Sequence, residues 1–176
     1  MSHYFTASLS EQGTHFFRVV DQLKTRGGSA TASLYGTFIG LLAVEVAAVR
    51  DRAAPEVLQA FRDDAAEVLA PLGALARLYV ELVREEAESA RDDAWEGLCR
   101  RRSAIEVLVT VYAGTPVTAE IQPPDVERLD SAMRRVGQEQ GPVHPERRQE
   151  GVPASHWWWR YPETSAAPSM GAANFL

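Results

Sequence analysis

Few side chains of this sequence have the type and spacing that metal, acid–base or nucleophilic chemistry needs. Its four histidines are His3, His15, His144 and His156. The one pairing at helical spacing, Glu11 with His15, is more typical of a surface contact than of a metal site. Cys99 is the only cysteine and has no base beside it, which favours a buried thiol over a nucleophile. We therefore expect no metal, no cofactor and no enzymatic activity.

Arginines occur in short runs that could bind phosphate. These runs are Arg100-Arg101-Arg102, Arg134-Arg135 and Arg147-Arg148. A helix spreads three consecutive side chains around its cylinder, so a single surface cannot use all three. The acidic stretches 85–88 and 92–93 lie nearby and are expected to pair with them. Because the net charge is also −6, we do not expect nucleic acid as the partner.

Two opposite charges occupy positions that helical patterns predict to be buried. Glu45 is the only charged residue between positions 30 and 49, and Arg102 continues the apolar row that runs from Trp95 to Val109. A buried charge needs a partner of opposite sign. We expect an ion pair between Glu45 and Arg102 that sets the register of two helices more than it adds stability.

Aromatic rings are concentrated near the C-terminus, in the segment His-Trp-Trp-Trp-Arg-Tyr-Pro at 156–162. Each ring offers roughly 150–250 Å² of surface that prefers burial, so something must cover this segment. In an extended conformation side chains alternate, and Trp157 and Trp159 would face away from Trp158. Folding of the segment over its own helices is the alternative to docking. We expect these residues to bind a partner: Trp157, Trp158, Trp159, Arg160 and Tyr161.

The first half of the chain predicts helices. Ser8 and Glu11 form a possible capping box for a helix that ends at Gly27-Gly28. A second helix over residues 30–52 is apolar nearly all round, which places it in a core, an oligomer or a membrane. The residues that dilute its hydrophobicity favour a buried helix over a membrane span. Its stripe of small residues, with Gly36 and Gly40, predicts close helix packing.

The third helical pattern is the most regular one. Apolar residues recur at steps of three and four from Leu58 to Leu82, and the phase is unchanged across Pro71. We therefore expect one long helix over residues 55–89, with a kink near the proline.

The remaining elements complete an all-α prediction. A fourth helix is expected over residues 92–113 and a short fifth over 124–137, ended by Gly137. From residue 138 onward, prolines and glycines without periodicity indicate a tail without regular structure. The expected fold is an antiparallel bundle of four main helices plus a short fifth over 1–137, with an extended C-terminal arm over 138–176.

Composition is that of a single globular domain of 176 residues, 45% of them hydrophobic. Lys24 is the only lysine, a bias typical of GC-rich bacterial genomes. A lone cysteine and the lack of a visible secretory signal favour a cytoplasmic location.

These features favour a non-enzymatic interaction or scaffolding subunit of a bacterial multi-protein assembly. It would self-associate through its apolar helices and dock its aromatic arm on a protein partner or a second copy. Two alternatives stay open. One is a helical enzyme or binding protein for an apolar small molecule held near Tyr35, Phe38, Trp95 and Tyr112. The other is a nucleic-acid-binding accessory subunit.

Overall fold

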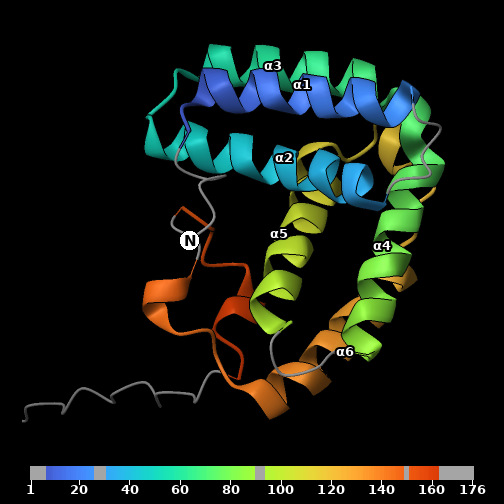
Figure 1. Ribbon diagram of the computed structural model, residues 1–176, viewed down its shortest axis with the longest axis vertical. Coiled ribbons are helices and arrows are strands. Elements are labelled where there is room, and N and C mark those ends of the chain that lie inside the picture. Colours follow the sequence, from blue (N-terminus) through green and yellow to red (C-terminus); the bar gives the residue numbers. More distant parts are fainter. Residues whose placement is uncertain (1–6, 26–30, 90–93, 149–150, 163–176) are drawn as a thin grey trace, which may run out of the picture.

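Every regular element that the structure describes is helical, which confirms the all-α prediction (Figure 1). The computed structural model describes residues 7–25, 31–89, 94–148 and 151–162. The α-helices are α1 (Leu9–Thr25), α2 (Thr31–Arg50), α3 (Pro55–Leu69), α4 (Gly73–Glu88), α5 (Trp95–Val111) and α6 (Pro123–Gln140). Short 3-10 turns are η2 (Ala70–Leu72), η3 (Pro116–Thr118), η4 (Pro145–Arg147) and η5 (Trp157–Trp159).

Helices α1, α2 and α3 pack together at one end of the molecule (Figure 1). The Ser8 amide donates to Glu11 Oε2 at 2.8 Å, which confirms the predicted capping box. A Cβ atom added to Gly40 would lie 3.2 Å from Phe16 Cδ2, and one on Gly36 would lie 3.3 Å from Val19. The small residues of α2 therefore allow α1 to approach closely, as predicted. The predicted stop at Gly27-Gly28 lies outside the described residues.

The predicted long helix is two helices rather than one. The 3-10 turn η2 separates α3 from α4, and Figure 1 shows α4 leaving the turn in a new direction. Pro71 has no amide hydrogen and its ring crowds the preceding turn, so the α-helical hydrogen bonds cannot continue. Burial nevertheless continues along both helices, through Ala65 and Leu69 on α3 and Ala76 and Val83 on α4. The unchanged phase therefore reflected a shared core, not an unbroken helix.

Helix α5 lies in the interior between α2 and α6. Its C-terminal half is helical through Val111, as favoured over the strand alternative by the sequence. Helix α6 runs past the predicted end at Gly137 and stops at Gly141, which has a φ of 74°. Gly137 is instead a packing position, because a Cβ atom there would lie 2.8 Å from Tyr161 Cδ1. The predicted domain boundary at 137 thus falls inside α6.

Helix α2 is the one described helix long and apolar enough to cross a membrane. Most of its residues are buried against other helices of the same chain, among them Phe38, Leu41 and Val44. A core helix of a globular protein shows the same length and composition.

Candidate functional site

The described part of the C-terminal segment, residues 151–162, folds back onto α5 rather than extending away from it. Trp158 and Trp159 are each 1% exposed and His156 is 3% exposed. All three side chains converge on one residue of α5, Ser103, whose Oγ lies 3.0 Å from His156 Nδ1, 3.0 Å from Trp158 Nε1 and 2.8 Å from Trp159 Nε1. We call these four residues the Ser103 cluster.

The hydrogen bonds of the Ser103 cluster determine the protonation state of its histidine. An indole Nε1–H is a donor only, so Trp158 and Trp159 together use both acceptor positions of the Ser103 hydroxyl. The hydroxyl hydrogen must then point to His156 Nδ1, which therefore accepts and carries no proton. His156 is consequently neutral, with its hydrogen on Nε2.

Burial acts in the same direction on this imidazole. Desolvation lowers the pKa of His156 from 6.5 to about 4, and Arg102 and Arg160 lower it further while Glu106 opposes them. A protonated imidazole would also present a third donor to a hydroxyl that already accepts two. Both effects keep His156 neutral at physiological pH.

A serine bonded to a histidine resembles a nucleophile–base pair, but this pair cannot act as one. Ser103 is 0% exposed, and its oxygen lone pairs are directed to two indoles. The Cys99 thiol is buried as predicted, and burial raises its pKa far above the usual range. The Ser103 cluster therefore organises the core rather than performing chemistry.

Arg102 links the Ser103 cluster to α6. Its side chain is 4% exposed and binds Asp130 at 2.6 Å and Glu106 at 2.8 Å. The guanidinium also lies over the Trp158 ring, 4.2 Å from its centroid. The predicted buried arginine is thus confirmed, but its predicted partner Glu45 is wrong.

Glu45 pairs instead with Arg62 of α3, through two hydrogen bonds of 2.8 and 2.6 Å. The error has a geometric cause: Glu45 lies on the face of α2 that is turned toward α3, a helix whose arginines the sequence pattern had assigned to solvent. The buried hydroxyl of Tyr112 has no hydrogen-bond partner among the described residues.

The outer aromatic residues of the segment pack on α6. Trp157 contacts Tyr161 edge to face at 5.2 Å between ring centroids, and the Arg134 guanidinium lies 4.8 Å from the Trp157 centroid. Arg160 donates to the Ala154 carbonyl at 3.3 Å. The predicted alternation of the rings is wrong because η5 is a 3-10 turn, in which Trp158 and Trp159 both face the core. These two rings are already covered within their own chain, so they cannot be the predicted partner-binding surface.

A pocket of about 200 Å³ lies beside the Ser103 cluster, between α2 and α5, and residues 151–156 form one of its walls. We call it the His156 pocket. Its apolar lining includes Leu42, Val46, Val107, Val111 and Pro153, and its polar lining includes Glu45, Glu106, Thr110 and His156.

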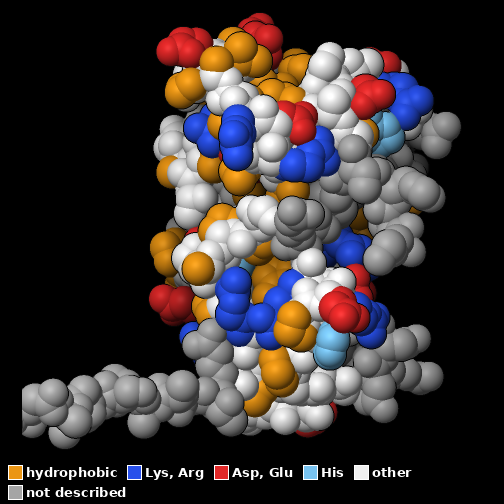
Figure 2. Space-filling view, turned by 90° about the vertical axis from the view of Figure 1, so that its left-hand side faces the viewer, with side chains coloured by type: hydrophobic (Ala, Val, Ile, Leu, Met, Phe, Trp, Pro, Cys, Tyr) orange, Lys and Arg blue, Asp and Glu red, His pale blue; other side chains and the backbone are white. Residues whose placement is uncertain are grey.

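A second concave surface runs between the C-terminal end of α2 and the start of α3. This α2–α3 groove has a volume of about 880 Å³. Its apolar lining includes Ala48, Val49, Ala53, Pro55 and Leu58, with charges supplied by Arg52, Glu56, Arg62 and Asp63. Val49 is 65% exposed and Val57 of α3 is 58% exposed. Figure 2, which faces this end of the molecule, shows hydrophobic side chains gathered over its upper part among charged ones.

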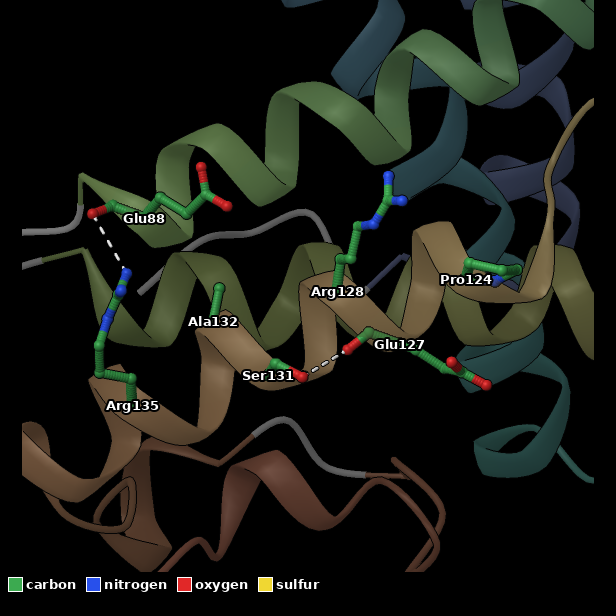
Figure 3. Close-up of a pocket in the computed structure, with 7 residues that line it drawn as sticks. All are labelled: Glu88, Pro124, Glu127, Arg128, Ser131, Ala132 and Arg135. Carbon is green, nitrogen blue, oxygen red and sulfur yellow. Dashed lines mark hydrogen bonds between the residues drawn. The ribbon is translucent and has the colours of Figure 1, made fainter.

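The described arginines of the predicted phosphate-binding runs are spread over several contacts. Arg101 binds Glu86 at 2.7 Å, as the nearby acidic stretch predicted, and Arg100 binds Glu96 at 2.9 Å. Figure 3 shows the trough between α4 and α6, where Arg135 donates to the Glu88 carbonyl at 3.4 Å. Glu127 and Arg128 also line this trough, so its charge is mixed. A single basic face for nucleic acid does not form from these residues.

The aromatic residues proposed for an apolar ligand pack against core side chains. Phe38 is 0% exposed and stacks on Tyr79 at 4.8 Å between centroids, while Tyr35 contacts Tyr79 edge to face. Trp95 and Tyr112 are 5% and 2% exposed. The side chain that sequence reasoning missed is Ser103, a small polar residue inside a helical pattern with no local signal of its partners.

Comparisons with protein-family models, with curated proteins and with solved structures found no match.

Proposed function

We propose that this chain is a non-enzymatic interaction subunit of a bacterial assembly and that it self-associates through the α2–α3 groove. The observation that carries the proposal is the exposure of Val49, 65%, on a groove with an apolar floor. Apolar surface of this kind, rimmed by charges, is typical of a protein contact site.

A second copy of the chain is the occupant that the charges favour. The groove carries both signs, with Arg52 and Glu56 near the start of α3 and Asp63 about two turns further on. A two-fold contact repeats each residue on both sides of the interface, so an acidic group of one copy can oppose an arginine of the other. A groove of one sign would instead favour a partner of opposite charge.

The C-terminal segment has a different part in this proposal from the one that the sequence predicted. Trp158 and Trp159 complete the core of their own chain, so self-association does not use them. The half-buried residues Trp157, Arg160 and Tyr161 lie on another part of the surface, against α6.

Sedimentation equilibrium of the full chain tests this function. We expect a concentration-dependent mass that approaches twice 19.4 kDa. Val49→Glu places a charge on the groove and should return the monomer mass. The matched control is Leu78→Glu on α4, a 39% exposed residue outside the groove, which should leave the association unchanged. A monomer at all concentrations, or equal effects of the two variants, would overturn the proposal.

A further inference from the structure

We propose that the His156 pocket is a binding site for a small uncharged molecule with an apolar body and one hydroxyl group, such as a phenol. The proposal goes beyond self-association and does not depend on it. It rests on the composition of the pocket and on the orientation of His156 by the Ser103 cluster.

The hydrogen-bond donor of the site is the second ring nitrogen of His156. Nδ1 accepts from Ser103, so the hydrogen of the neutral ring is on Nε2. Among the described residues no hydrogen bond engages Nε2, while the ring lines the pocket. The ring is fixed by its Ser103 bond and by stacking on Trp158 at 4.9 Å between centroids, so the donor is held in place before a ligand binds.

The acceptor of the site is the carboxylate of Glu106. Its Oε2 binds Arg102 at 2.8 Å, while no hydrogen bond to Oε1 occurs among the described residues. A ligand hydroxyl can accept from His156 Nε2 and donate to this carboxylate at the same time. An ether or a ketone could use only the first of these groups.

The charges of the pocket select against ions of either sign. Glu45 and Glu106 both line it, so an anionic ligand meets two carboxylates. Each carboxylate already has an arginine partner, Arg62 for Glu45 and Arg102 for Glu106, so a cation gains little. An uncharged hydroxyl compound matches both conditions.

The size and walls of the pocket set the rest of the ligand. A dry cavity of about 150 Å³ in another protein binds benzene, so about 200 Å³ accommodates one substituted ring. Valine and leucine side chains from α2 and α5 supply apolar contact on two sides.

Titration of the full chain with phenol, followed by two-dimensional NMR and by tryptophan fluorescence, tests the site. We expect saturable shifts at His156 and Trp158, with toluene and benzoate each binding at least about tenfold more weakly because one lacks the hydroxyl and the other is charged. Val111→Phe, which fills the pocket, should abolish the saturable shifts.

Val46→Phe fills the same pocket from α2 and serves if Val111→Phe does not fold. Unsaturable phenol shifts, or toluene or benzoate binding as tightly as phenol, would overturn the proposal. Undiminished phenol binding by a folded pocket-filling variant would overturn it as well. None of these outcomes depends on the oligomeric state, so failure of this site and failure of the α2–α3 groove proposal are separate results.

Discussion

Trp159 Nε1 donates to Ser103 Oγ at 2.8 Å, although 56 residues separate the two in sequence. This bond, with those of Trp158 and His156, attaches the C-terminal aromatic segment to the middle of α5. The segment is therefore a part of the core that the first helices leave incomplete.

Replacement of Ser103 by alanine should destabilise the protein by about 2–4 kcal/mol. The variant leaves the Trp159 indole N–H and His156 Nδ1 buried without their partner, and each such group costs about 1–3 kcal/mol. Urea denaturation measures the loss. Ser131→Ala on the exposed face of α6 removes only a bond to the Glu127 carbonyl and should change stability by less than about 0.5 kcal/mol. Equal effects of the two variants would contradict the role of Ser103.

Stability should fall as pH decreases from 6.5 to 4. His156 has a pKa of about 4 in the folded state and 6.5 when free, so between these values only the unfolded chain binds the proton. Above pH 6.5 the imidazole is neutral in both states and the full stability is present. The loss over this window is roughly 3 kcal/mol. Glu106, Arg102 and Arg160 surround the ring, and their net effect is included in the lowered pKa.

Urea denaturation at a series of pH values checks this dependence against two variants. His156→Asn keeps an acceptor near the position of Nδ1 and removes the titrating group, so it should flatten the dependence. His144→Asn is the control, because the His144 side chain is 66% exposed. A wild-type stability that stays constant from pH 6.5 to 4.5 would refute the assigned neutral state.

Arg102→Met should destabilise the protein by about 3 kcal/mol, because it leaves Asp130 and Glu106 without their counter-charge and removes the contact over Trp158. Combining it with Asp130→Leu should recover part of this loss, since the second change removes one unpaired charge. Arg77→Met breaks an exposed pair with Glu81 and should cost less than about 1 kcal/mol. Thermal unfolding of the four variants distinguishes these cases; strictly additive losses in the double variant would argue against a coupled pair.

Gly137→Ala should loosen the packing of the aromatic segment on α6. The added Cβ would lie 2.8 Å from Tyr161 Cδ1 and 3.1 Å from Trp95 Cζ2. Trp95 is buried, so Tyr161 must move, and we expect a net loss of about 1–3 kcal/mol despite the better helix propensity of alanine. Gly97→Ala in α5 meets only the flexible end of Arg101 and should be neutral or stabilising. Calorimetry that ranks the two variants in the opposite order would show that Tyr161 is not held against α6.

Local signals in the sequence predicted much of the fold. The Ser8–Glu11 capping box, the small residues Gly36 and Gly40 and the apolar periodicity each reflect contacts within a helix or along one helix face. The break at Pro71 was underestimated because core burial keeps its phase through the 3-10 turn. Gly137 was assigned to a helix end because sequence alone does not distinguish a stop from a close approach.

The Ser103 cluster could not be predicted in the same way. Its hydrogen bonds join residues more than 50 positions apart, and the indole rings signal only that a cover exists, not which surface supplies it. The same reason explains why Glu45 and Arg102 were paired with each other. Both were correctly expected to need a counter-charge, but their partners Arg62 and Asp130 lie on faces whose burial depends on tertiary packing.

Hydrogen exchange of the tryptophan indole N–H groups, measured by NMR at several protein concentrations, tests the central claim most directly. The indoles of Trp158 and Trp159, assigned through Trp→Phe variants, should be protected nearly as strongly as the core amides of α5, and their protection should not change with dilution. Exchange at the rate of an unfolded peptide, or protection that disappears on dilution, would contradict burial of these rings within their own chain.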